Sequence, residues 1–175
     1  RKSEIDNHLE ILIKLAKSYS LTNPSYQFVL SLNKENSLSE NKCLKEQNIT
    51  LMKGNTREVL KACDYGVISS GTATLEAMLS KTPFCVIYKS NSISNFIISN
   101  ILLNLDNISL PNILAGNKII SELRQSNVEV TKIVFELNSL IDGSNKEILK
   151  EFKNLHHSLI NKDENKFSKI IDNLI

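Results

Sequence analysis

The sequence predicts an α/β fold in which a parallel sheet carries helices on both faces. Short apolar runs typical of buried strands alternate with helical stretches along the chain, which is the pattern of a parallel sheet with helical crossovers. The 175 residues suffice for a full core, and 41% hydrophobic with 23% charged residues is ordinary for a globular protein. We expect this sheet domain over residues 1–125 and a helical extension over residues 126–175.

Each element has its own sequence signal. Ser3 to Tyr19 predicts a helix with an apolar stripe and Ser3 as its cap. The predicted strands are Tyr26–Leu32, Asn48–Met52, Gly66–Ser69 and Phe84–Tyr88. Further predicted helices are Asn41–Gln47, Arg57–Cys63 with Thr56 as cap, Thr72–Ser80, Ile119–Gln125, Thr131–Ile141, Asn145–Ile160 and Glu164–Leu174.

The turn between the third strand and its helix is the strongest functional signal. Ser70 can cap the helix, and Gly71 permits a sharp turn and the close approach of a ligand. The first helical amides, from Thr72 onward, have no partner within the helix and lie at the positive end of its dipole. This arrangement predicts a phosphate site.

Glu76 extends this prediction from a phosphate to a nucleotide. It lies about one turn inside the same helix. A carboxylate does not favour a phosphate, but it can accept hydrogen bonds from two ribose hydroxyls. The alternative is an ordinary strand, turn and helix with a solvated Glu76, because a single glycine is weaker evidence than a glycine-rich fingerprint.

Three segments follow predicted strands and should meet at one edge of the sheet. They are Lys53 to Arg57, Ser69 to Thr74 and Tyr88 to Ser90. Ligands of open parallel sheets collect at the carboxyl ends of the strands, so we expect one crevice there. None of the three histidines lies near these motifs in the sequence.

Two later segments leave alternatives open. Ser92 to Leu105 is mostly apolar but too short and too polar in places to span a bilayer, so it predicts core or subunit packing, or contact with lipid. Asn112 lies between apolar residues and is either a buried structural amide or a substrate contact.

Composition excludes several classes of protein. The net charge of +2 does not indicate a nucleic-acid-binding protein. Cys43, Cys63 and Cys85 show no metal spacing and no disulfide framework, and we expect Cys63 and Cys85 to be core residues. No signal peptide or long apolar span is present, which favours a cytoplasmic protein. The chain does not begin with Met and opens directly in a helical pattern, so we expect it to be part of a longer protein.

Several of these motifs, taken in order, closely resemble lipid-A-disaccharide synthase. They are Arg57-Glu58, Ile68-Ser-Ser-Gly-Thr-Ala-Thr-Leu-Glu76, Thr82-Pro83, Tyr88 and Ser109-Leu-Pro-Asn-Ile-Leu-Ala-Gly116. The opening Arg1-Lys2-Ser3-Glu4-Ile5 is similar to the end of the family's Gly-Ser-Arg-x-x-Glu-[Val/Ile] motif. The likeness runs from Arg1 to about Gln125. One departure is Asn117-Lys118, where the family often has Arg.

The resemblance implies an inverting glycosyltransferase of family 19 with the GT-B architecture, in which two Rossmann-like domains enclose the reaction. Such an enzyme transfers 2,3-diacylglucosamine from UDP-2,3-diacylglucosamine to 2,3-diacylglucosamine 1-phosphate (lipid X), and makes lipid A disaccharide 1-phosphate. Residues 1–125 would be the UDP-sugar-binding domain, in the C-terminal half of the enzyme. The helical extension would pack on this domain or on the N-terminal half, which would carry the acceptor site and the base. We expect the chain alone to be inactive.

The resemblance also implies site residues and partners. The UDP-binding residues would be Ser70, Gly71, Thr72, Ala73, Thr74, Glu76, Lys53 and Arg57, and the catalytic residues Arg1 and Asn112. No metal or other cofactor is implied, and none of the partners is a nucleic acid. The enzyme would be cytoplasmic, attached peripherally to the inner membrane, and able to form a homodimer. The competing hypotheses are another UDP-sugar enzyme of this architecture, such as a 2-epimerase, and a non-catalytic UDP-binding remnant.

Overall fold

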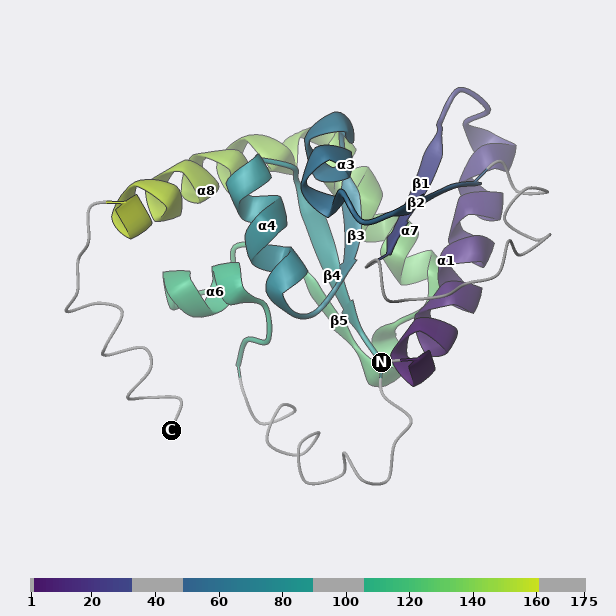
Figure 1. The fold of residues 1–175 in the computed structure, drawn as a ribbon, viewed down its shortest axis with the longest axis horizontal. Helices are drawn as coiled ribbons and strands as arrows, with labels where there is room; N and C mark the ends of the chain where they lie inside the picture. The colour runs from purple at the N-terminus through teal and green to yellow at the C-terminus, as the bar shows by residue number, and fades with distance from the viewer. Residues whose placement is uncertain (1, 33–48, 90–105, 161–175) are drawn as a thin grey trace.

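The computed structural model describes residues 2–32, 49–89 and 106–160 (Figure 1). Its strands are β1 (Phe28–Leu32), β2 (Ile49–Lys53), β3 (Gly66–Ser69), β4 (Phe84–Tyr88) and β5 (Glu122–Arg124). Its α-helices are α1 (Lys2–Thr22), α3 (Thr56–Ala62), α4 (Thr72–Ser80), α6 (Leu110–Ala115), α7 (Val130–Ser139) and α8 (Asn145–Ile160). A 3₁₀ turn, η2 (Gln125–Asn127), follows β5, and a π-helical turn, η3 (Leu140–Ser144), joins α7 to α8.

All strand pairs in the described residues are parallel, which confirms the predicted α/β class. The strands form two sheets rather than one: β1 pairs with β2, and β4 lies between β3 and β5. The register places Gly66 beside Phe84 and Tyr88 beside Arg124, so β3, β4 and β5 end at the same edge of the larger sheet.

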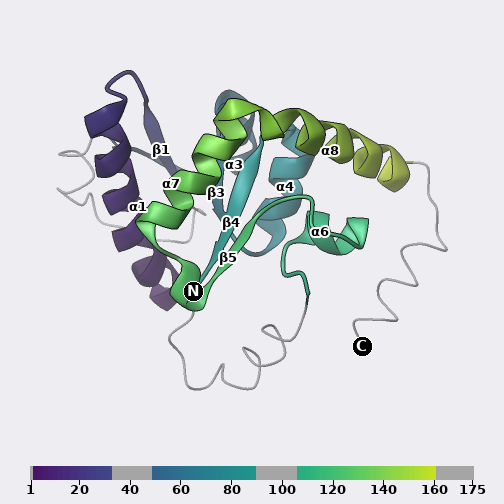
Figure 2. The ribbon, with the colours of Figure 1, turned by 180° about the vertical axis from the view of Figure 1, so that it is seen from behind.

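Strand β4 divides the core into two layers. Phe84 and Val86 are fully buried in a cluster with side chains of α4 and α8. Cys85 and Ile87 point the opposite way, as alternate strand residues do, and pack with side chains of α1 and α7. Figure 1 shows α4 in front of the larger sheet, and Figure 2, from behind, shows α7 in front of it. The larger sheet is therefore covered on both faces, as predicted.

Most predicted elements agree with the structure. Gly66–Ser69, Thr72–Ser80, Phe84–Tyr88 and Asn145–Ile160 match exactly in their bounds. Cys85 is buried, and burial raises the pKa of its thiol to about 12. Helix α7 packs on α1 and β4, and α8 packs on α4 and α6. The division of the chain at residue 125 stays a prediction.

One predicted helix and three predicted caps are wrong. Ile119–Gln125 contains β5, because pairing with β4 overrides the helix propensity of Glu-Leu-Arg. Ser3 lies inside α1. The cap of α3 is Asn55, in the left-handed region at φ 55°, and the cap of α4 is Gly71. Asn41–Gln47, Ser92–Leu105, Glu164–Leu174 and Cys43 lie outside the described residues. No described helix is both long enough and apolar enough to cross a bilayer.

Candidate functional site

The turn between β3 and α4 presents backbone donors that have no partner among the residues that the structure describes. Gly71 has φ 142° and ψ −163°, a conformation that is essentially restricted to glycine, and it caps α4. The Gly71 and Thr72 residues are exposed, and a Cβ at Gly71 would meet no atom within 4 Å. Within the described residues, the amides of Thr72 and Ala73 donate no hydrogen bond. The helix N-terminus is thus open to an anion.

Ser70 and Thr74 hold this turn in place. The Ser70 amide donates to the Ile87 carbonyl (3.1 Å), and its hydroxyl donates to the Ile108 carbonyl (3.1 Å). The fully buried Thr74 donates from its hydroxyl (2.7 Å) and its amide (3.1 Å) to the Gly71 carbonyl. Ser70 therefore does not cap α4, and both polar groups of Thr74 support the turn.

Glu76 lies on the same exposed face of α4 as Thr72. Residues four apart on a helix are neighbours on one face, so the carboxylate lies about one turn beyond the open amides. Glu76 is exposed and makes no hydrogen bond or ion pair with another described residue. It is free to accept hydrogen bonds from a ligand bound at the turn.

Asn112, in α6, is fully buried and uses its whole amide inside the chain. Its Oδ1 accepts hydrogen bonds from the amides of Ile119 (2.8 Å) and Ile120 (3.0 Å). Its Nδ2 donates to the Ile120 carbonyl (2.9 Å) and to Glu122 Oε1 (2.9 Å). Of the two alternatives, the structure shows the buried structural amide.

Glu122 joins β5 to the start of α6. Its side chain is 4% exposed. Oε1 accepts from the Ser109 amide (2.9 Å) and hydroxyl (2.7 Å), and Oε2 accepts from the Ile108 amide (3.0 Å). Arg124 Nη2 donates to Oε2 at 2.6 Å and to the Asp106 carbonyl at 2.8 Å. A buried carboxylate is tolerated here because charged and polar donors surround it.

These hydrogen bonds decide the ionisation of Glu122. Burial alone would raise its pKa, but hydrogen bonds from the Ser109 hydroxyl, from Arg124 and from two backbone amides outweigh burial and hold the pKa below its usual value. A lowered pKa in the folded state means that the unfolded chain binds the proton more tightly.

We expect the stabilisation from Glu122 to be complete above the ordinary carboxyl pKa of about 4.5 and to be lost as the pH falls below it. The measurement is the free energy of unfolding in urea between about pH 3 and 7. Glu122→Gln should flatten the acid side of this profile. Glu129→Gln, at an exposed ion pair with Lys132 (3.6 Å), should leave it steep. Equal slopes for both variants would contradict the assignment.

The structure brings only some of the predicted site residues together. The Ser70–Thr74 turn and the start of α6 are joined directly, since the Leu110 amide donates to Thr74 Oγ1 (3.3 Å). Lys53 ends β2 and Arg57 lies in the first turn of α3; both are exposed, and no hydrogen bond or ion pair joins them to the described part of the turn. Arg1 lies outside the described residues.

Glu122, Ser109 and His8 are not among the site residues that the sequence predicts. Glu122 falls within the predicted helix Ile119–Gln125, and a charged residue in a helix usually lies on its solvent-exposed face, so nothing in the sequence marks it as buried. His8 is far from the motifs in sequence, but it is buried in α1 and its Nε2 accepts from the Lys89 amide (3.1 Å) just after β4. A polar residue on the buried stripe of α1 was the available signal.

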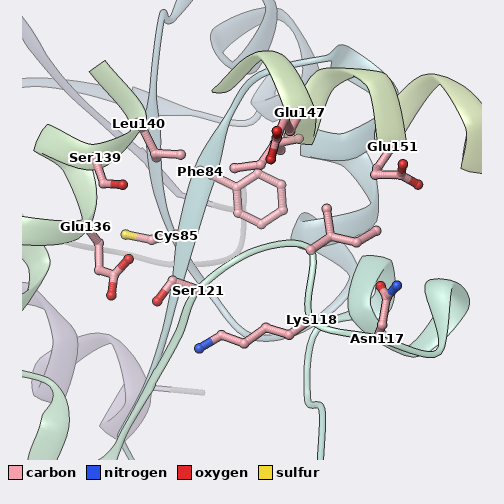
Figure 3. Close-up of a pocket in the computed structure, with 12 residues that line it drawn as sticks. Phe84, Cys85, Asn117, Lys118, Ser121, Glu136, Ser139, Leu140, Glu147 and Glu151 are labelled. Carbon is pink, nitrogen blue, oxygen red and sulfur yellow. The ribbon is translucent and has the colours of Figure 1, made fainter. Parts of the chain in front are cut away.

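A cavity of about 360 Å³ lies away from this turn, beside Phe84 and Cys85 at the start of β4 and Ser121 before β5 (Figure 3). Glu136, Glu147 and Glu151 also line it, and Lys118 is the one lysine or arginine among the described residues that line it. This balance of charge disfavours a diphosphate. In the described residues, no group of three or more His, Cys, Asp or Glu side chains is placed to hold a metal.

Comparison with known proteins gives one consistent family. Residues 1–172 match the family model described as lipid-A-disaccharide synthetase. Lipid-A-disaccharide synthase of Idiomarina loihiensis is 32% identical and aligns with 100% of this chain. The enzymes of the same name from Francisella philomiragia and Francisella tularensis subsp. tularensis are 36% and 38% identical over 77% and 73% of this chain. The chain spans 47%, 36% and 34% of the lengths of these three relatives. It belongs to the lipid-A-disaccharide synthetase family.

Proposed function

We propose that this chain is the donor-binding half of a glycosyltransferase of lipid A biosynthesis. The donor would be UDP-2,3-diacylglucosamine and the acceptor lipid X. The observation that carries the proposal is the N-terminus of α4, where the amides of Thr72 and Ala73 donate no hydrogen bond within the described residues. Glu76 lies about one turn further on the same face as Thr72. Amides suit the diphosphate, and the carboxylate suits the two ribose hydroxyls.

The reaction would be a single displacement with inversion. An acceptor hydroxyl of lipid X attacks the anomeric carbon of the donor sugar, and the bond from that carbon to the β-phosphate oxygen breaks. UDP leaves with the electron pair, and the attacking hydroxyl loses its proton to a base. We assign that base to the part of the enzyme outside this chain. The amides at α4 would stabilise the charge that develops on UDP.

The other expected residues take supporting roles in this proposal. Arg1 would meet the diphosphate, with Lys53 and Arg57 near the nucleotide. Asn112 would act through the buried network that orders α6, since its amide groups are already paired within the chain. By the resemblance, the enzyme would work at the cytoplasmic face of the inner membrane, attached peripherally, and could form a homodimer.

The contact between Glu76 and the ribose predicts discrimination by the sugar hydroxyls. The chain should bind UDP more tightly than 2′-deoxy-UDP by about tenfold, because the deoxy nucleotide loses one hydrogen bond to a carboxylate. In Glu76→Ala, UDP should bind more weakly by about 1–3 kcal/mol, and the two nucleotides should bind equally. Isothermal titration calorimetry measures both quantities.

Glu147→Ala is the matched control, since it removes another exposed carboxylate near a helix N-terminus, in the first turn of α8. It should keep both the affinity and the discrimination. If Glu76→Ala still distinguishes UDP from 2′-deoxy-UDP as the parent does, the ribose does not lie on Glu76. If UDP does not bind the parent chain, the proposed donor site is not formed in this chain.

A further inference from the structure

We propose that Glu122 is a positioning residue for the donor site, although it lies on β5 and reaches none of the ligand-facing groups itself. This inference rests on the proposed function, because it names the residue that shapes the UDP site. Glu122 positions the site in two steps. It holds residues 108–110 by hydrogen bonds, and these residues in turn hold the turn before α4.

The first step fixes the chain before α6. Glu122 accepts hydrogen bonds from the amides of Ile108 and Ser109 and from the Ser109 hydroxyl. Ile108 is 8% exposed and Ser109 is fully buried, so water does not compete for these groups. One carboxylate thus sets the position of two successive peptide units.

In the second step, residues 108–110 hold the turn before α4 by hydrogen bonds. The Ile108 carbonyl accepts from the Ser70 hydroxyl (3.1 Å), and the Leu110 amide donates to Thr74 Oγ1 (3.3 Å). Ser70 and Thr74 flank the open amides of Thr72 and Ala73. Hydrogen bonds to both sides of the turn therefore depend on a segment that Glu122 holds.

Only a carboxylate satisfies this environment. Besides residues 108 and 109, the amide group of Asn112 (2.9 Å) and the guanidinium of Arg124 (2.6 Å) also donate to Glu122. A glutamine of the same shape would place its NH₂ group against donors in either orientation of its amide. Glu122→Gln should therefore shift the 108–110 segment and disorder the turn before α4.

The test measures UDP affinity by calorimetry in the parent chain and in Glu122→Gln. We expect Glu122→Gln to bind UDP about tenfold or more weakly. Ile133→Ala is the control for stability, since Ile133 is fully buried on α7 in the opposite core layer. It should lower the melting temperature and keep UDP affinity within about twofold, because Ile133 packs in the core layer that does not contain the side chains of α4, and its side chain makes no hydrogen bond to the turn or to residues 108–110.

Ser109→Ala keeps the test informative if Glu122→Gln does not fold. It removes one donor to Glu122 (2.7 Å), and it should weaken UDP binding in the same direction by a smaller factor. If Glu122→Gln folds and binds UDP as tightly as the parent chain does, the inference is overturned. If Glu122→Gln does not fold, the same result in Ser109→Ala overturns it. An equal loss of affinity in Ile133→Ala would also overturn it.

A second readout separates this inference from the proposed function. If the parent chain fails to bind UDP, the proposed function fails. The inference is then tested without ligand, because ¹H–¹⁵N NMR reports the environment of the amides in the turn. The Gly71, Thr72 and Ala73 signals should move in Glu122→Gln and stay in place in Ile133→Ala. Unchanged turn signals in Glu122→Gln would overturn the inference.

Discussion

Replacing Asn112 with alanine should lower the free energy of unfolding by about 3–5 kcal/mol, which is exceptional for one substitution. The variant would leave two amides, of the half-buried Ile119 and the buried Ile120, without their acceptor. It would also remove a donor from the Ile120 carbonyl and from the carboxylate of Glu122. Water does not reach this site, since Asn112 is fully buried. Chemical denaturation measures the loss.

Asn117→Ala is the matched control for this prediction. Asn117 lies just after α6 and is exposed, so its loss should cost less than about 0.5 kcal/mol. Asn112→Asp adds a test of mechanism, because it keeps the acceptor for Ile119 and Ile120 but sets a second carboxylate against Glu122. Similar stability in Asn112→Ala and Asn117→Ala would show that the buried network contributes little.

Gly71→Ala should reduce both stability and UDP affinity. An alanine at φ 142° and ψ −163° is strained by about 1–3 kcal/mol, although a Cβ there has open space. The added methyl group would project from the turn where the diphosphate is proposed to bind, and relief of strain would tilt the Thr72 and Ala73 amides. We expect UDP to bind about tenfold more weakly, by calorimetry.

Gly143→Ala separates these two effects. Gly143 lies between α7 and α8 with φ 130° and ψ −7°, and a Cβ there also meets no atom within 4 Å. Its substitution should cost stability through backbone strain and leave UDP affinity unchanged. If both glycine variants weaken UDP binding equally, the loss follows from general destabilisation and not from the turn.

The local pattern of the sequence predicted the central part of the fold. Phe84–Tyr88 is a continuous apolar run, so the strand β4 was predicted correctly. Ser69-Ser70-Gly71 is a typical turn sequence, so the start of α4 just after it was also predicted correctly. Strand β5 was missed because Glu122-Leu-Arg124 favours a helix locally and becomes a strand only through pairing with β4.

The candidate site was predictable where it depends on one segment. The open amides of α4 and the exposed Glu76 follow from the residues around Gly71. The hydrogen bonds that Glu122 accepts from the amides of Ile108 and Ser109 join segments more than ten residues apart, and the periodicity of a sequence does not predict such contacts. The cap expected at Ser70 failed for the same reason, because its hydroxyl bonds to Ile108, which is distant in sequence.

The most direct test of the donor-site proposal is a UDP titration of the ¹⁵N-labelled chain followed by ¹H–¹⁵N NMR. The proposal predicts saturable shifts centred on the amides of Gly71, Thr72 and Ala73, with smaller shifts toward Glu76. The absence of any shift at saturating UDP would contradict it. Shifts centred instead on the cavity beside Ser121 and Glu136 would place the nucleotide at the opposite end of β4 and would also contradict it.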